Sequence, residues 1–342
     1  MKATLIVPCW NSAGTLPRIL GDVRAQTLGD FEAIFVDDGS TDSTARTLAE
    51  AAAADPRIRI ITLPKNRGVS AARNAALDAA RGEFIFFADP DDSISPRMLE
   101  KGVAAMEAER ADYCVFPYRE RFEGDAEAHL VPLKGECRHT SNDEIVRLHM
   151  SRMFGYSFEH VKAWYAGTPL FEHRVQGGVC WCVFRRSLVE EHHVRFNEGI
   201  VLYEDAMFNC AYLLHAQRMT RVDEPLYDYL HARTGAVARL RRGGRELENK
   251  LELLRARNAL DAASGGRLEP MYAASCVFSV LEMLQIVMTF RAPFLGGLRI
   301  VREYLANGTV RRALAGFPLS ARRPFLALAV FILRALCRRR SQ

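Results

Sequence analysis

Three carboxylates come directly after an apolar run in the segment FIFFADPDD, residues 84–92. Asp89, Asp91 and Asp92 fill three of its last four positions. Close carboxylates repel one another, so holding them together costs free energy unless a cation or hydrogen-bond donors compensate. Mg²⁺ and Mn²⁺ prefer carboxylate oxygens, and one or two carboxylates commonly hold them together with substrate phosphates. The spacing of Asp89 and Asp91 therefore predicts a site for Mn²⁺ or Mg²⁺ that faces a diphosphate.

One of these acids has an alternative, purely structural role. A helical pattern begins near Pro96, and Asp92 or Ser93 precedes it. Asp and Ser side chains cap helices because their oxygens accept hydrogen bonds from the free backbone amides of the first turn. A cap of this kind explains one carboxylate and leaves the other two unexplained.

The elements that must position these acids alternate along the first 116 residues. Runs rich in β-branched and aromatic residues alternate with helical patterns, which predicts right-handed βαβ units and a mostly parallel, Rossmann-like sheet flanked by helices. The strands are apolar throughout, as expected when helices cover both faces of the sheet. The predicted strands are residues 4–7, 31–36, 58–63, 84–88 and 112–116, and the predicted helices are about 14–27, 42–54, 69–81 and 96–109.

Polar residues follow each of the first four predicted strands. They occupy residues 8–11, 37–42, 66–68 and 89–92, and six of them are acids. Ligands bind outside the carboxyl ends of the strands in open α/β sheets, so these segments are expected to form one site. The acids of segment 37–42 alone also suit a turn followed by a helix cap. The sequence contains neither GxGxxG after the first strand nor GxxxxGK[ST], which excludes the common dinucleotide and nucleoside triphosphate loops.

The rest of the chain is less regular up to about residue 245 and helical beyond it. A helix is expected over Asp143–Met153, and Ser157–Gly178 is expected to be loop-rich. Further elements are expected as follows: a short strand at 181–184, a helix at about 187–192, a helix after Glu204-Asp205, a strand-like run from Pro225 to Tyr229, and helices with apolar stripes at 247–258 and 271–289.

Composition narrows the class of protein. The 342 residues are 49% hydrophobic and 25% charged, as in a soluble globular protein with a substantial core. The eight cysteines form no CxxC pair, which predicts reduced thiols rather than a zinc site. The N-terminal segment MKATLIVPCW lacks the pattern of a secretory signal, so a cytoplasmic location is expected.

Several long motifs in series resemble the family 2 glycosyltransferases, which have the GT-A fold. The motifs are VPCWNSAGTLPRIL, FVDDGSTDSTARTL, NRGVSAARNAALDAARGEFIFFADPDD, WCVFRRSLVEEHHVRFNEGIVLYEDAMFNCAYL and DEPLYDY. The resemblance covers roughly residues 1–240. It implies a metal-dependent, inverting transfer of a sugar from a UDP-sugar donor to a saccharide or lipid-linked glycan acceptor, in the synthesis of cell-surface polysaccharide.

The resemblance also implies roles for individual residues. The nucleotide-sugar would be bound by Pro8, Trp10, Asn11, Asp38, Gly68, Arg73 and Asp89, and the metal by Asp91 with Asp89. Glu204-Asp205 matches an acidic pair that supplies the general base, with Asp205 the first choice and Glu204 the second. An acid at the start of a helix also complements the helix dipole, so the residues alone leave both interpretations open.

Three positions depart from the family pattern. Trp10 stands where many relatives have Tyr, and Pro90 separates the two metal-site acids in place of a small polar residue. The segment LHARTGAVAR has Ala236 where the family often has Ser. Its His231 and Arg233 are candidates to reach the diphosphate or the metal, and a structural role for the histidine is an equal alternative.

The predicted organisation is a glycosyltransferase domain over residues 1–240 and a helical region over 241–342. Residues 1–120 are expected to bind nucleotide-sugar and metal, and residues 121–240 to form the acceptor side. The net charge is +5, but Arg299–Gln342 has ten arginines and one acid, Glu303. The helical region is therefore the basic part of the chain.

The segment RRPFLALAVFILRALCRRR, residues 322–340, has arginines on both sides of an apolar run. The uninterrupted apolar stretch of residues 324–333 is too short for a bilayer, which requires about 20 residues. An interfacial helix on an anionic membrane surface is expected, which would make the protein peripheral. A helix packed on the protein with solvated arginines is the alternative, and no nucleic-acid motif is present.

Two other functions deserve comparison. A nucleotidyltransferase would need a basic, Gly-rich loop after the first strand, and CWNSAGTL contains no basic residue. A nucleotide-sugar-binding protein without catalysis would not need both Asp91 and Asp205. The sequence therefore favours a glycosyltransferase over both.

Overall fold

The structure is a computed structural model that describes residues 1–122, 124–125, 127–170, 177–231, 245–289 and 292–338. The chain divides into two units. The first unit comprises Met1–Met150 and Gly177–Gly235, and the second comprises Ser151–Gln176 and Ala236–Gln342. The second unit thus takes in residues 151–176 as well as the helical region. The functional division at residues 120 and 240 stays a prediction.

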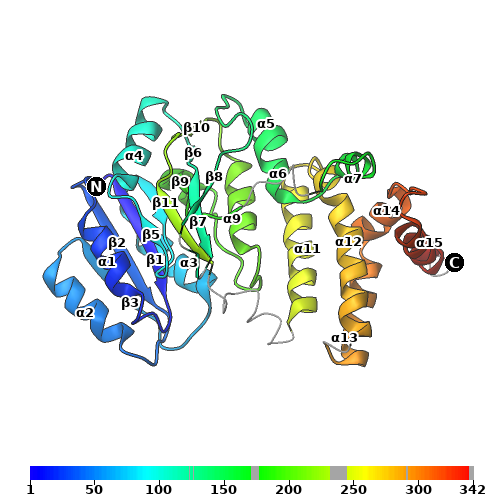
Figure 1. The fold of residues 1–342 in the computed structure, drawn as a ribbon, viewed down its shortest axis with the longest axis horizontal. Coiled ribbons are helices and arrows are strands. Elements are labelled where there is room, and N and C mark those ends of the chain that lie inside the picture. Colours follow the sequence, from blue (N-terminus) through cyan, green and yellow to red (C-terminus); the bar gives the residue numbers. More distant parts are fainter. Residues whose placement is uncertain (123, 126, 171–176, 232–244, 290–291, 339–342) are drawn as a thin grey trace. The chain divides into compact units, whose positions relative to one another are not determined.

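A seven-stranded sheet forms the centre of the first unit, in the order β10-β6-β9-β4-β1-β2-β3 (Figure 1). Strands β1, β2, β3 and β4 run parallel, whereas β9 runs antiparallel to both β4 and β6. The predicted α/β fold with a mostly parallel sheet flanked by helices is confirmed. The strands are β1 (Ala3–Cys9), β2 (Phe31–Asp37), β3 (Ile58–Thr62), β4 (Phe84–Phe87), β6 (Tyr113–Val115), β9 (Cys182–Arg185) and β10 (Met219–Arg221).

Strand order places the carboxyl ends of β1 and β4 at the point where the connections change direction. The chain proceeds from β1 outward through β2 and β3, and then returns to the other side of β1 as β4. Every residue of β1, β2 and β4 is buried, because helices cover the sheet and apolar side chains point to both faces. Ligands of open α/β sheets bind at such a switch point.

The helices of the first unit follow the predicted order, with one difference at residues 92–98. Ser93–Ile94 forms strand β5, and α4 begins only at Met98, so the predicted helix cap at Asp92 or Ser93 is wrong. The helices are α1 (Leu16–Arg24), α2 (Thr44–Ala54), α3 (Val69–Ala79), α4 (Met98–Ala108), α5 (Asn142–Glu144), η1 (Ile145–Met150, a π-helix), α8 (Arg186–Glu191) and α9 (Glu204–Leu213).

A second, four-stranded sheet was not expected as such. Its order is β5-β11-β7-β8, and its strands are β5 (Ser93–Ile94), β7 (Tyr118–Phe122), β8 (His129–Val131) and β11 (Tyr227–His231). Strand β11 pairs with β5 and so returns to the segment that follows the acid cluster. The strand-like run predicted up to Tyr229 is the start of β11.

The second unit is helical within its described residues. Its helices are α6 (Ser151–Phe154), α7 (Phe158–Tyr165), α11 (Glu246–Ala263), α12 (Glu269–Met288), α13 (Phe294–Ala306), α14 (Gly308–Gly316) and α15 (Pro324–Arg338). The loop-rich expectation for Ser157–Gly178 is wrong at α7, where the Ser157 side chain and His160 form a capping box. Figure 1 shows α11 and α12 alongside one another.

Helix α12 is the core helix of the second unit. Among the described residues it is the one helix long and apolar enough to cross a membrane. However, 56% of its most apolar stretch of 18 residues is buried inside the protein. Its side chains Tyr272, Cys276 and Val280 are fully buried. Burial by neighbouring helices accounts for its hydrophobicity, as in the core helix of a soluble unit.

Candidate functional site

The acid cluster lies where β4 ends, and its three members have different surroundings. Asp89 and Asp91 are partly exposed, whereas Asp92 is 1% exposed. Asp92 Oδ2 accepts a hydrogen bond from the Tyr227 hydroxyl at 2.6 Å, and Oδ1 accepts one from the Leu230 amide at 2.7 Å. Burial, and then the charge of Asp89, raise the pKa of Asp92 to about 8. Strand β11 therefore supplies the partners of this acid.

A buried guanidinium lies opposite Asp89. Arg73, on α3, is 2% exposed, and its Nη2 donates to Asp89 Oδ1 at 3.0 Å. Its Nη1 donates to Asp205 Oδ1 at 2.6 Å and lies 3.6 Å from Glu204 Oε1. The guanidinium also lies over the Phe196 ring, 5.3 Å from its centre. One cation thus bridges carboxylates from the end of β4 and from the start of α9.

Glu204 and Asp205 form the first turn of α9, where the helix dipole favours negative charge. Burial, and then the charge of Asp205, raise the pKa of Glu204 to about 8. Burial also raises the pKa of Asp205, and the charge of Arg73 opposes that rise. The preceding residue, Tyr203, has a left-handed backbone with φ 74°, which is unfavourable for a residue with a side chain. Backbone strain thus occurs directly beside the acidic pair.

Asp38 organises the loop before α3. Its two carboxylate oxygens accept hydrogen bonds from the amides of Arg67 and Gly68, each at 2.8 Å. The neighbouring Gly39 has φ +64°, and a Cβ there would lie 2.5 Å from the Lys65 backbone. Only glycine fits that approach. Asp38 therefore holds Gly68 in place, and its contact with a nucleotide stays a prediction.

The end of β1 is braced against the same loop region. Asn11 Oδ1 accepts a hydrogen bond from the Thr41 amide at 2.8 Å, and the Asn11 amide donates to Ser40 Oγ at 2.9 Å. Trp10 is 45% exposed beside it, whereas Pro8 is buried within β1. The structure thus brings the β1 and β2 ends together and leaves the indole of Trp10 accessible.

Residues that the sequence analysis did not single out connect these parts. Asn74 exchanges two hydrogen bonds with the Phe196 backbone, at 2.9 and 2.8 Å, and Arg67 Nη2 donates to Glu198 Oε2 at 2.9 Å. Tyr227 also accepts a hydrogen bond from the Asp89 amide at 3.0 Å. The motif DEPLYDY contained Tyr227, but no spacing rule connects a side chain to an acid 135 residues earlier.

The donor set at the end of β4 fits a divalent cation only in part. Within the described residues, no three His, Cys, Asp or Glu side chains are arranged to hold a metal ion by themselves. Asp89 and Asp91 offer hard carboxylate oxygens with partial exposure, although Arg73 occupies Asp89 Oδ1. This arrangement suits a cation whose remaining ligands are substrate phosphates and water.

Of the two residues in LHARTGAVAR that were candidates to reach the diphosphate or the metal, His231 is described and is the last residue of β11. His231 Nε2 lies 2.9 Å from Glu120 Oε2, and its ring stacks on Phe122 at 4.2 Å. These contacts give the histidine a structural role within the second sheet. Arg233 and Ala236 lie outside the described residues.

Comparisons with known proteins agree with this arrangement. Residues 4–165 match the model of the family described as glycosyl transferase family 2. Succinoglycan biosynthesis protein ExoO of Rhizobium meliloti is 30% identical over 240 residues, which cover 70% of this chain and 63% of that protein. The uncharacterized glycosyltransferase EpsJ of Bacillus subtilis is 30% identical over 228 residues, covering 66% and 60%. The chain thus matches somewhat less than two thirds of the length of these curated relatives.

The likeness extends to solved structures. TarS of S. aureus, in complex with UDP-GlcNAc, superposes with a TM-score of 0.55 and 19% identity, covering 93% of this chain and 80% of that chain. At this identity the likeness concerns the fold alone. The seven-stranded sheet and its helices are therefore those of a GT-A glycosyltransferase fold.

Proposed function

We propose that this chain, whose residues 4–165 match the family model of glycosyl transferase family 2, transfers a sugar from a UDP-sugar to a saccharide or lipid-linked glycan acceptor. The observation that carries the proposal is Arg73, which joins Asp89 at the end of β4 to Asp205 on α9. One buried cation thereby holds a donor-side and an acceptor-side carboxylate in one site. The UDP-GlcNAc complex of the structural neighbour supports a UDP-sugar donor, and the succinoglycan relative supports polysaccharide synthesis as the role.

Asp205 is the better general base of the two acids on α9. A base must be ionised, and the pKa of about 8 for Glu204 leaves that carboxyl protonated at neutral pH. Arg73 lies 2.6 Å from Asp205, whereas it lies 3.6 Å from Glu204, so it favours the ionised form of Asp205 more strongly. Asp205 accepts the proton of the acceptor hydroxyl while that oxygen bonds to the anomeric carbon. The bond from that carbon to UDP breaks, and the configuration inverts.

Asp91 and Asp89 are the residues that would hold Mn²⁺ or Mg²⁺ at the end of β4. The bound cation would neutralise negative charge on the leaving diphosphate. Because the described residues contain no group of three His, Cys, Asp or Glu side chains that could hold a metal ion, substrate phosphates and water would complete the coordination. Cation and UDP-sugar are accordingly expected to bind together.

The nucleotide is proposed to lie over the ends of β1 and β2. Trp10 presents an exposed aromatic face, Asn11 fixes the loop beside it, and Asp38 fixes Gly68. Pro8 lies in the buried strand β1, directly before Cys9 and Trp10. The Nε–H of Arg73 is buried without a hydrogen-bond partner among the described residues, which leaves one donor for the sugar or diphosphate.

The decisive experiment is UDP release from a panel of UDP-, GDP-, CMP- and dTDP-sugars, each with Mn²⁺, with Mg²⁺ and with EDTA. Release of UDP from one donor that stops with EDTA supports the proposal, and Asp91→Asn is expected to abolish it. Asp30→Asn is the matched control, because that carboxylate is exposed and remote from the acid cluster in sequence. It should leave release unchanged.

Binding of UDP-sugar without release, even with a range of saccharide acceptors, would instead show a nucleotide-sugar-binding protein. Pyrophosphate release from a nucleoside triphosphate would show a nucleotidyltransferase. Either result overturns the proposed transfer. UDP release that does not depend on metal would agree with the proposed transfer, but it would contradict the proposal that Asp91 holds a cation.

A further inference from the structure

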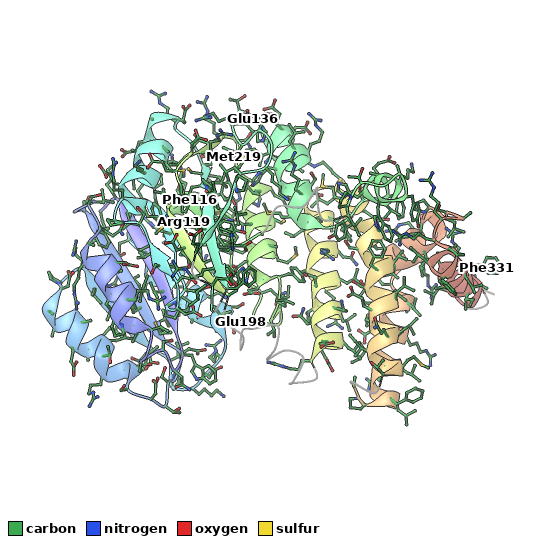
Figure 2. All side chains as sticks on the ribbon, in the orientation of Figure 1. Phe116, Arg119, Glu136, Glu198, Met219 and Phe331 are labelled. Atoms are coloured by element: carbon green, nitrogen blue, oxygen red, sulfur yellow. The ribbon has the colours of Figure 1, made fainter. Side chains whose placement is uncertain are left out.

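Helix α15 presents an apolar face to solvent. Val330 and Leu333 are buried against its neighbours, whereas Phe325 is 87% exposed and Phe331 62% exposed. The exposed apolar side chains recur at helical spacing and form one stripe, which we call the α15 stripe: Phe325, Leu328, Phe331 and Ile332. Figure 2 shows Phe331 on the outer side of α15. A soluble helix normally turns such a stripe toward the core.

Three arginines fix the helix in this orientation. Arg334 donates to the carbonyls of Leu314 and Phe317 at the end of α14, both at 2.6 Å. Arg322 donates to the Tyr165 carbonyl at 2.9 Å, and the Arg323 guanidinium lies 4.4 Å from the centre of the Trp164 ring. These side chains therefore bind the second unit itself. Arg322, Arg323 and Arg334 thus contact other parts of the second unit, as well as lying beside or within α15.

We propose that the α15 stripe inserts into the surface of an anionic lipid bilayer. The helix has 15 residues, so at 1.5 Å per residue it is about 22 Å long and too short to cross the hydrocarbon core. A short helix with an exposed apolar face and flanking cations lies in the plane of the interface. In the sequence, Arg338, Arg339 and Arg340 follow the segment that contains the stripe.

Charge distinguishes a membrane from a second copy of the chain. Arginines occur at both ends of the α15 segment, at residues 322–323 and 338–340. Two copies packed stripe to stripe would bring together two strongly basic segments, and like charges oppose such an interface. Anionic headgroups compensate the same charges. The ten arginines and one acid of Arg299–Gln342 extend this preference over the whole region.

The exposed large apolar side chains are concentrated in the C-terminal part of the chain, which contains α15. Among the described residues, nine of the fourteen exposed large apolar side chains lie between Met288 and Ile332. Helix α13 contributes Phe294, Leu295 and Leu298, with exposed Arg299 in the following position. A run of exposed apolar side chains such as the α15 stripe is uncommon on a soluble protein and marks a binding surface. The inference stands independently of the proposed transfer.

Vesicle co-sedimentation of the full chain tests the proposal. The protein is expected to bind vesicles of equal parts phosphatidylglycerol and phosphatidylcholine, and to bind pure phosphatidylcholine vesicles more weakly. The double variant Phe325→Ser/Phe331→Ser should lower the partition coefficient at least about tenfold, because two aromatic side chains no longer leave water. Leu130→Ser, an exposed apolar residue of the first unit, is the matched control and should bind as the unmodified protein does.

A second variant separates charge from apolar insertion. Replacing Arg338, Arg339 and Arg340 with Gln should weaken binding to anionic vesicles and reduce its sensitivity to salt. Light scattering after size-exclusion chromatography tests the alternative, in which a second copy of the chain covers the α15 stripe. A dimer that the Phe325→Ser/Phe331→Ser change dissociates, without vesicle binding by the unmodified protein, would overturn the proposal. Unchanged vesicle binding by that double variant would also overturn it.

UDP release in solution provides an independent check on both proposals. The Phe325→Ser/Phe331→Ser variant should release UDP at the normal rate, because neither side chain is part of the site on the first unit. Loss of vesicle binding with normal release therefore concerns the membrane alone. Absence of release in the unmodified protein would concern the proposed function alone.

Discussion

The first unit buries charge, whereas the second unit exposes apolar side chains. Around Arg73, three carboxylates and a guanidinium are largely removed from water, and Asp92 is buried beside them. Around α15, Phe325 and its neighbours remain in water. Both arrangements carry a free-energy cost that a folded chain usually avoids. The comparison teaches that each unit departs from ordinary burial at the place where we propose a ligand, a nucleotide-sugar for the first unit and a lipid surface for the second.

Removing the central cation of the first unit is expected to have the largest effect. Arg73→Met leaves buried carboxylates uncompensated and should lower the free energy of unfolding by about 3–5 kcal/mol, with loss of transfer. Urea denaturation at pH 7 measures the change. The loss should be smaller at pH 5, because burial raises the pKa of Asp205 and protonation at the lower pH removes its charge.

Arg67→Met is the control for that variant, because Arg67 forms an exposed ion pair with Glu198. Exposed pairs contribute about 0–1 kcal/mol, so its stability should change little. If Arg73→Met were equally mild, the charge cluster would not be a costly feature of the first unit, and the comparison with the second unit would fail.

Changing the acids on α9 should reduce activity more than stability. Asp205→Asn is expected to slow transfer about 10²–10⁴-fold while UDP binding persists, because a general base contributes on that scale. Glu204→Gln should slow it less than about tenfold, since Glu204 holds its proton at neutral pH and Gln resembles the protonated form. Steady-state rates and UDP titrations give the two quantities. A larger loss in Glu204→Gln would assign the base to Glu204.

The buried acids also predict how stability depends on pH. The pKa of Asp92 is raised from its ordinary value of about 4 to about 8, so between these values the folded protein holds a proton that the unfolded chain releases. The free energy of unfolding should therefore fall as pH rises through this window. Asp92→Asn should flatten the fall by up to about 1.4 kcal/mol per pH unit. Urea titrations from pH 5 to pH 8.5 measure it.

Asp78→Asn is the matched control for the pH measurement, because Asp78 is 65% exposed and paired with Arg195 at the surface. It should leave the slope of stability against pH unchanged. A slope that is equally steep in Asp92→Asn would show that the buried proton belongs to another group.

The smallest expected effect lies on α15. Phe325→Ser should change the free energy of unfolding by no more than about 0.5 kcal/mol, because the side chain is exposed. Leu333→Ala, two turns later on the buried face, should cost about 2–5 kcal/mol. Thermal or urea unfolding compares them. A large loss in Phe325→Ser would mean that its ring is part of the core, and the α15 stripe would be lost as a distinct surface.

The part of the site at the strand ends could be predicted, because each sequence pattern that indicates a strand or its polar end is local. Apolar runs such as Phe84–Phe87 predicted buried strands, and the alternation of strands and helices predicted a parallel sheet whose polar strand ends meet at one edge. Arg73 and Asp205 are 132 residues apart, and only the family resemblance placed them in one site. The spacing of residues in the sequence does not by itself predict a contact between side chains so far apart along the chain.

The second sheet could not be predicted because its pairings are long-range. Ser93 suited a helix cap, but β5 pairs with β11 more than 130 residues later, and that pairing replaces the cap. The same return of the chain brings Tyr227 to Asp92. Local preferences were overridden by tertiary hydrogen bonds, and the sequence contains no short-range record of them.

The antiparallel strand β9 has a consequence for how the chain is made and cut. Strand β9 covers the edge of β4, yet its first residue, Cys182, is synthesised 95 residues after Phe87. At about 5–20 residues per second a ribosome leaves that edge uncovered for about 5–20 s. The family match ends at residue 165, so a gene fragment cut there would encode β4 without β9 and Arg73 without Asp205. Such a fragment should aggregate on expression, whereas one that extends through β11 retains every strand of both sheets.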